Sequence, residues 1–290
     1  MTPLDRAMAL PCWSGKVTAQ PLDGGITNLN FLVQDGARKA VVRIGDDIPL
    51  HQILRPNELA ASRAAALAGV SPAVLYHEPG ALVIAFVEGS TLSATDFQHE
   101  RLRGQAVDLI RQAHSSIPQF LRGPVQMFWA FHVIRDYAAT LRDGQSRHVD
   151  LLPALLTEAA RLEAGVGPID LVYGHNDLLP ANFINDGQRL WLIDWDYAGF
   201  NSPLFDLGGF AANNGLSPDH ERAVLARYFG RKPDAGLIRA YLAMKSAAAL
   251  RETLWSMVSE IHSRLDFDYA TYTATNLATY RASLDAFLNH

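Results

Sequence analysis

The stretch that decides the fold is YGHNDLLPANFINDGQRLWLIDWDYA, residues 173–198. Two short apolar segments, 183–184 and 190–193, stand on either side of the polar sequence Asn185-Asp186-Gly187. Short apolar segments that are separated by an Asp-Gly turn are typical of a β-hairpin. Pro180, just before the first segment, favours a short loop. The stretch therefore predicts a loop followed by a hairpin, and the two ends of the hairpin lie side by side.

Three oxygen-bearing side chains belong to this loop and hairpin. Phosphoryl transfer needs a group that orients the acceptor hydroxyl, ligands that hold Mg²⁺ against the phosphates, and charges that offset the developing charge. Asp177 suits the first task, whereas Asn182 and Asp194 offer the oxygen ligands that Mg²⁺ prefers. We interpret the stretch as a phosphoryl-transfer site. The alternative is a surface hairpin with solvated carboxylates.

A candidate phosphate-binding segment lies upstream, at residues 22–33, which read LDGGITNLNFLV. Gly24 and Gly25 stand there between two extended segments, and the apolar strand that follows, 40–44, carries Arg43. Glycines let backbone amides approach phosphate oxygens closely, and a guanidinium can bridge two of those oxygens. The glycine pair has a second interpretation, which is an ordinary hairpin turn.

Residues 55–69, RPNELAASRAAALAG, predict a helix. Pro56 suits its first turn, the alanine-rich run favours helix, and Gly69 suits its end. Glu58 then lies near the start of the helix. It either pairs with Arg43 and fixes that cation, or complements the helix dipole.

The order of these features resembles the choline/ethanolamine kinase branch of the aminoglycoside-phosphotransferase-like kinases, over nearly the whole chain. The resemblance implies an α+β, protein-kinase-like two-lobe fold. Residues 1–87 would form a small, β-rich, nucleotide-binding N-terminal lobe. Residues 88–290 would form a larger, mainly helical lobe that carries catalysis and substrate binding. Phe86 and Glu88 would lie at the hinge, where the backbone meets the adenine.

The resemblance also implies ATP and Mg²⁺ as cofactors and assigns roles by motif. Asp177 becomes the catalytic base, and Asn182 and Asp194 become the metal ligands. Asp196 stands where the branch usually has Glu, and we place it among the substrate contacts together with Asp177. The residues expected to bind the nucleotide are Gly24, Gly25, Thr27, Asn28, Arg43, Glu58, Phe86 and Glu88.

A C-terminal helix predicted over 239–265 indicates where the acceptor binds. Trp255 lies off the apolar stripe of this helix, and with Tyr272 it can hold an ammonium group by cation–π attraction. Choline kinases place aromatics at what look like these two positions. The alternative is a tryptophan packed against a second helix. The predicted buried stripe is Leu242, Ser246, Leu250, Leu254, Met257 and Ile261.

Glu252 stands where choline kinases tend to have another aromatic, one turn before Trp255. At this i, i+3 spacing the two side chains share a helix face. A carboxylate beside an aromatic wall suits a smaller or hydrogen-bonding ammonium, such as ethanolamine or an amino sugar, better than choline. The alternative is a solvated surface glutamate.

The function expected from these features is Mg²⁺- and ATP-dependent phosphorylation of a hydroxyl on choline, ethanolamine or a similar small cationic alcohol. Two alternatives stay open. The same scaffold serves aminoglycoside and thiamine kinases. The second alternative is a nucleotide-binding regulatory protein without catalysis, although such a protein has no need of Asp177, Asn182 and Asp194 together.

Composition sets further limits. The chain has 290 residues, 49% hydrophobic, with a net charge of −5, and it contains no basic tract, so we expect no nucleic-acid partner. The single cysteine, Cys12, excludes an internal disulfide. No apolar run approaches a bilayer span and no signal peptide is apparent, so we expect a cytoplasmic protein without membrane insertion. The oligomeric state stays open, with a homodimer as one option.

Overall fold

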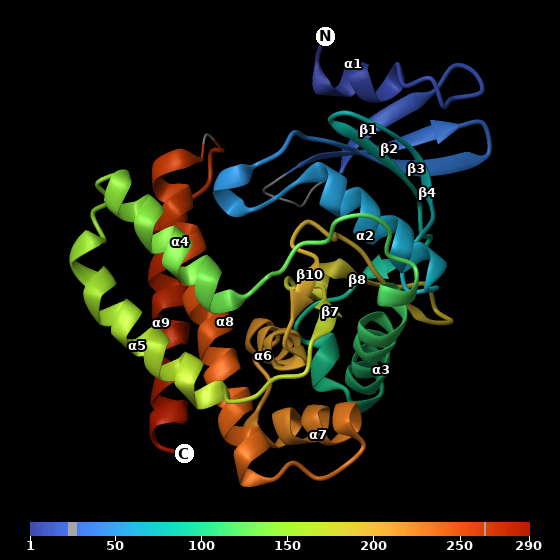
Figure 1. Cartoon of the computed structure of the whole chain (residues 1–290). Helices are drawn as coiled ribbons and strands as arrows, with labels where there is room; N and C mark the ends of the chain where they lie inside the picture. The colour runs from blue at the N-terminus through green and yellow to red at the C-terminus, as the bar shows by residue number, and fades with distance from the viewer. Residues whose placement is uncertain (23–27, 264) are drawn as a thin grey trace.

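An antiparallel sheet forms the N-terminal part of the computed structural model, which describes residues 1–22, 28–263 and 265–290. Its five strands lie in the order β1-β2-β3-β5-β4. The short helix α1 (Pro3–Met8) lies beside this sheet (Figure 1). The strands are β1 (Thr18–Leu22), β2 (Leu29–Asp35), β3 (Arg38–Ile44), β4 (Val74–Glu78) and β5 (Ala81–Ala85).

The alternation of side chains along β3 directs Arg43 into the cleft between the lobes. Successive residues of a strand point to opposite faces of its sheet. Ala40 and Val42 join Phe31 and Val33 in a small core on one face. Arg43 and Val41 point to the other face, where both border a cavity. The predicted strand therefore places its lone cation as expected.

The predicted alanine-rich helix is present as α2 (Arg55–Leu67), with Pro56 in its first turn. Gly69, just past its end, has φ 74°, a conformation that glycine adopts without strain. Three alanines of α2, at positions 61, 64 and 65, belong to the same hydrophobic core as the C-terminal helices. This helix therefore packs with the helical lobe as well as with the sheet.

The C-terminal part is mainly helical, and α8 (Ala235–His262) lies at its centre, in contact with several other helices (Figure 1). The α+β, two-lobe prediction is confirmed; the boundary at residue 87 stays a prediction. No helix within the described ranges is both long enough and apolar enough to cross a membrane. The other helices are α3 (Glu100–Ser116), α4 (Ala130–Asp143), α5 (Leu152–Val166), α6 (Pro203–Asn213), α7 (Pro218–Phe229) and α9 (Tyr269–Leu288).

The stripe predicted for α8 needs correction at both ends. Leu242 is only partly buried, and Ile261 is 37% exposed because it lies in the last turn. The helix also ends at His262 rather than at 265. Because α4, α5, α6 and α9 all contact α8, its buried residues are not confined to one stripe. The four middle residues of the predicted stripe, Ser246, Leu250, Leu254 and Met257, are buried.

The predicted hairpin is present as β8 (Phe183–Asn185) and β9 (Leu190–Leu192), which pair antiparallel. Gly187 in the turn has φ 89°. The loop before the hairpin starts at β7 (Val172–Gly174), which pairs with β10 (Gly199–Asn201). Both ends of the catalytic stretch are thus tied to paired strands. The remaining short elements are β6 (Ser90–Thr91), η1 (Pro49–His51), η2 (Asp96–Gln98), η3 (Ile117–Gln119), η4 (Val149–Leu151) and η5 (Pro180–Asn182).

Candidate active site

Asp206, in the first turn of α6, fixes the backbone of the loop that follows β7. Its carboxylate accepts the backbone N–H of His175 at 2.8 Å and that of Asn176 at 2.7 Å. His114 Nε2 lies 2.8 Å from the same carboxylate. Burial alone would raise the pKa of Asp206, but these hydrogen bonds and His114 hold it below its usual value. Asp206 therefore stays ionised and holds the loop in one conformation.

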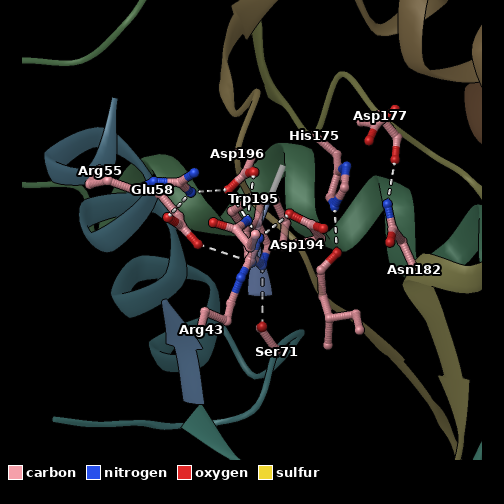
Figure 2. Close-up of polar contacts among 12 residues, drawn as sticks. Arg43, Arg55, Glu58, Ser71, His175, Asp177, Asn182, Asp194, Trp195 and Asp196 are labelled. Atoms are coloured by element: carbon pink, nitrogen blue, oxygen red, sulfur yellow. Dashed lines mark hydrogen bonds and ion pairs between the residues drawn. The ribbon is translucent and has the colours of Figure 1, made fainter. Parts of the chain in front are cut away.

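The side chains of this loop connect it to the strand that leaves the hairpin. His175 Nε2 lies 2.9 Å from the backbone oxygen of Ile193 (Figure 2). Asn176 Nδ2 donates to the backbone oxygen of Tyr197 at 2.9 Å, and Asn176 itself has φ 64°. A positive φ at a non-glycine residue persists only where its surroundings hold it. The loop and residues 193–197, which follow the hairpin, are therefore held together as one unit.

Asn182 lies between the loop that carries Asp177 and the segment that carries Asp194. Its Nδ2 donates to the backbone oxygen of Asp177 at 2.8 Å, and its backbone oxygen accepts the N–H of Ile193 at 3.0 Å. Because the amide nitrogen is held by Asp177, the side-chain oxygen is directed away from it. Asp194 follows Ile193 and has φ 70°. The hairpin brings Asn182 and Asp194 to the same cavity, as the sequence predicted.

The donor set fits Mg²⁺. It consists of an amide oxygen from Asn182 and a carboxylate from Asp194, and Mg²⁺ in nucleotide sites usually takes one or two such ligands plus phosphate oxygens and water. The part of the chain that the structure describes holds no group of three or more His, Cys, Asp or Glu suited to a metal. A site completed by phosphates needs no such group.

A buried ion cluster lies beside Asp194 (Figure 2). Arg43 Nη1 is 2.9 Å from Glu58 Oε1, and Arg43 Nη2 is 2.8 Å from Asp194 Oδ1. Arg55 Nη1 contacts Glu58 Oε2 at 2.7 Å and Asp196 Oδ1 at 2.9 Å. Burial raises the pKa of Glu58 above its usual value, although both arginines oppose the shift. The Arg43–Glu58 pair expected from the sequence is present.

Asp196 borders the smaller cavity described below, where the acceptor is expected, and also takes part in this ion cluster. Its carboxylate is buried and accepts hydrogen bonds from Asn28 at 3.1 Å, from Arg43 at 3.1 Å and from Arg55. These partners come from the N-terminal part of the chain, so Asp196 joins the two lobes. Asn28, expected at the phosphates, takes part in the same cluster. The other glycine-segment candidates, Gly24, Gly25 and Thr27, lie outside the described residues.

A cavity of about 310 Å³ lies between the lobes, where the sheet faces the hairpin. Asn182 and Asp194 border it from one side, and Arg43 and Phe86 from the other. Phe86 donates its backbone N–H to the backbone oxygen of Lys39 at 3.3 Å. The side chain of Glu88 is 73% exposed and pairs with Lys39. Of the two hinge candidates, Phe86 borders the cavity, and Glu88 is not among the described residues that line it.

A smaller cavity, about 170 Å³, adjoins it and shares Asn182 and Asp194. All five acceptor candidates border this cavity: Asp177, Asp196, Glu252, Trp255 and Tyr272. Tyr272 donates its hydroxyl to Glu252 Oε1 at 2.8 Å. The rings of Trp255 and Tyr272 are 6.3 Å apart and nearly perpendicular. The residues predicted from the hairpin and from α8 thus meet at one place.

Trp255 combines both interpretations weighed for it. Only 4% of its surface is exposed, and its Nε1 donates to the hydroxyl of Tyr197 at 2.9 Å. It is therefore packed in the core and also borders the cavity. Its ring is held from behind by His51, at 5.1 Å between centroids.

Arg251 is a residue of this site that the sequence analysis missed. It is 3% exposed, lies 4.2 Å above the ring of Tyr197, and donates to Glu252 Oε2 at 2.9 Å. Burial raises the pKa of Asp177 well above its usual value, Arg251 opposes the shift, and Glu252 adds to it. The available signal was a charged pair, Arg251-Glu252, in an otherwise apolar stretch of helix.

Comparison with known proteins gives this geometry a family. The profile of the phosphotransferase enzyme family matches residues 18–253, which include every acidic residue of the two cavities. The chain belongs to this family. The family prediction from the motifs is confirmed, as is the expectation of a phosphotransferase enzyme.

Relatives of this phosphotransferase align along most of its length. Protein LicA of Haemophilus influenzae is 28% identical over 261 residues, which cover 85% of this chain and 75% of LicA. Probable ethanolamine kinase A of Dictyostelium discoideum is 26% identical and covers 94% and 87%, respectively. The crystal structure of a choline/ethanolamine kinase family protein from Mesorhizobium loti is similar with a TM-score of 0.80 and 27% identity, covering 98% and 94%. The chain is thus similar to choline and ethanolamine kinases in sequence and in fold.

Proposed function

We propose that this phosphotransferase moves the γ-phosphoryl group of ATP, with Mg²⁺, to the hydroxyl of a small amino alcohol. The observation that carries the proposal is the junction of the two cavities. Asn182 and Asp194 border both of them, whereas Asp177 borders only the smaller one. A nucleotide in the larger cavity therefore directs its phosphates at an acceptor beside Asp177.

Each residue has a task that its position allows. Asn182 and Asp194 would hold Mg²⁺, which supplies charge neutralisation at the phosphates. Arg43, fixed by Glu58, would contact phosphate oxygens. Asp177 would accept the proton of the acceptor hydroxyl while the hydroxyl oxygen bonds to the γ-phosphorus and the bond to the β,γ-bridging oxygen breaks. ADP is the leaving group.

The acceptor wall favours an amine that donates hydrogen bonds. Trp255 and Tyr272 provide aromatic surface for a cation. Glu252 adds a carboxylate that is 24% exposed and already oriented by Tyr272 and Arg251. A primary ammonium can donate to this carboxylate, whereas a quaternary ammonium cannot. Ethanolamine-like acceptors are therefore preferred over choline.

The experiment is Mg²⁺- and ATP-dependent ADP release with ethanolamine, choline, thiamine and kanamycin in turn. The proposal predicts turnover with the first two and a higher kcat/KM for ethanolamine. Turnover with thiamine or kanamycin alone would keep the kinase and reject the amino alcohol. Nucleotide binding without turnover of any acceptor would indicate a regulatory protein.

A further inference from the structure

The smaller of the two cavities described above is called the acceptor cavity here. A further cavity, about 250 Å³, adjoins it on the side away from the proposed nucleotide cavity, and we call this space the second cavity. The two have Asp177, Arg251, Glu252 and Tyr272 in common. At ~30 Å³ per water molecule, the added volume is on the order of eight waters. Ethanolamine fits in the acceptor cavity and leaves the second cavity to solvent.

Gly209, in the middle of α6, borders the second cavity. A glycine inside a helix costs about 1 kcal/mol relative to alanine. A Cβ built at Gly209 meets no atom within 4 Å, so packing does not demand glycine there. At the neighbouring Gly208, by contrast, a Cβ would lie 2.7 Å from the Cα of Lys245 in α8. Helix packing explains Gly208, whereas Gly209 only keeps space open.

The second cavity has neutral hydrogen-bonding groups among apolar side chains such as Phe205 and Ala248. Asn213 reaches it from α6, and Asn276 and Thr279 reach it from α9. Ligand sites typically combine open space with a few polar groups that fix orientation. Such a wall suits an extension that carries hydroxyl or amide groups at a few positions. Because Glu252 lies at the junction, the ammonium belongs there and any extension continues beyond it.

We propose that the acceptor is an amino alcohol with a polar extension, hydroxyl or amide, on its amine side, and that the extension occupies the second cavity. This rests on the proposed function. The hydroxyl beside Asp177 receives the phosphoryl group, the amine meets Glu252, and the extension hydrogen-bonds with the walls that α6 and α9 provide. Gly209 is then a specificity-determining residue.

The test compares kcat/KM for ethanolamine with kcat/KM for diethanolamine and N-(2-hydroxyethyl)glucamine. Wild-type protein should favour the extended acceptors at least tenfold. Gly209→Leu projects a side chain into the second cavity and should lower that preference about tenfold, because the extension loses its space. Gly209→Ala, which adds only a Cβ, should keep most of the preference. Thr279→Leu narrows the cavity from the opposite wall and serves if Gly209→Leu does not fold.

Three results would overturn the inference. Ethanolamine as the best acceptor of the wild type would leave the proposed function standing and reject the extension. An equal loss of kcat/KM for short and extended acceptors in Gly209→Leu and Thr279→Leu would show that the second cavity is a route of entry or a structural void, not a binding site. No turnover with any of the three amino alcohols would reject the proposed function, and the inference with it.

Discussion

Asp206 holds two backbone N–H groups of the loop that carries Asp177, at His175 and Asn176. Replacing it with alanine leaves both donors buried without a partner, at about 1–3 kcal/mol each. We expect Asp206→Ala to lower the free energy of unfolding by about 3 kcal/mol, measured by urea denaturation. Asp108→Ala is the control, since Asp108 pairs with Arg227 on the surface, where such pairs contribute about 1 kcal/mol or less. Equal losses in the two variants would contradict the account.

Glu252 should decide between primary and quaternary amines. Glu252→Gln keeps the contact with Tyr272 but removes the charge. We expect KM for ethanolamine to rise about tenfold, which corresponds to ~1.4 kcal/mol, with KM for ATP unchanged and KM for choline raised less. Glu260→Gln is the matched control on α8. Glu260 pairs with Arg147 and is not among the described residues that line the acceptor cavity or the second cavity. A parallel rise for both acceptors would make Glu252 a general electrostatic residue.

Single residues were predictable where their roles depend on near neighbours. Asp177, Asn182 and Asp194 lie within one loop and hairpin, so their spacing indicated a common site. The role of Asp206 could not be predicted from its neighbours, because the amides that it binds lie about thirty residues away. Arg251 was missed because its burial results from helix packing that no local pattern reports.

At the scale of elements, the contact of α6 with α8 can be tested at two adjacent glycines. Gly208→Ala forces a Cβ against the backbone of Lys245, and overpacking of this kind costs about 1–3 kcal/mol. Gly209→Ala meets open space and removes backbone freedom from the unfolded chain, so it should stabilise by about 0.4–1 kcal/mol. Thermal unfolding of the two variants measures both changes in stability. The same sign of change in both would show that the two glycines share one environment.

Elements with a local signal were predicted well. The hairpin followed from its Asp-Gly turn, and α2 followed from Pro56, its alanines and Gly69. The surroundings of α8 were not predictable, because its residues are buried against several helices and a single stripe assumes one packing partner. The end of α8 was placed three residues too late for want of a stop signal in the sequence.

At the scale of the whole molecule, His51 connects the sheet region to the helical lobe. It ends η1, between β3 and α2, and its ring packs on Trp255 of α8 and on Tyr137 of α4. Burial, together with the charges of Arg251 and His262, lowers its pKa to about 3. The neutral ring therefore belongs to the folded state at ordinary pH.

This burial predicts an acid-sensitive stability. Histidine in the unfolded chain titrates near 6.5, so between about pH 6.5 and 3 the unfolded state binds a proton that the folded state does not. The contribution is fully present above pH 6.5 and falls by ~1.4 kcal/mol per pH unit below it. His51→Phe keeps an aromatic ring and should lose this slope. Identical dependence of the unfolding free energy on pH from 7 to 4 in both proteins would contradict the prediction.

The two-lobe fold was predictable because the order of motifs along the chain corresponds to a known family. The contacts between the lobes were not. Asp196 was expected at the acceptor and borders that cavity, but its bonds to Asn28, Arg43 and Arg55 across the lobes were not foreseen. Such contacts depend on how two separately patterned regions meet, which neither pattern contains.

The most direct test of the central claim is transfer of the ATP γ-phosphoryl group to ethanolamine by wild-type protein and by Asp177→Asn, with the Kd for ATP measured in both. The account predicts that kcat of the variant falls by a factor of about 10²–10⁴, the usual contribution of a general base, while the Kd for ATP stays within about twofold. Turnover by Asp177→Asn near the wild-type rate would contradict it.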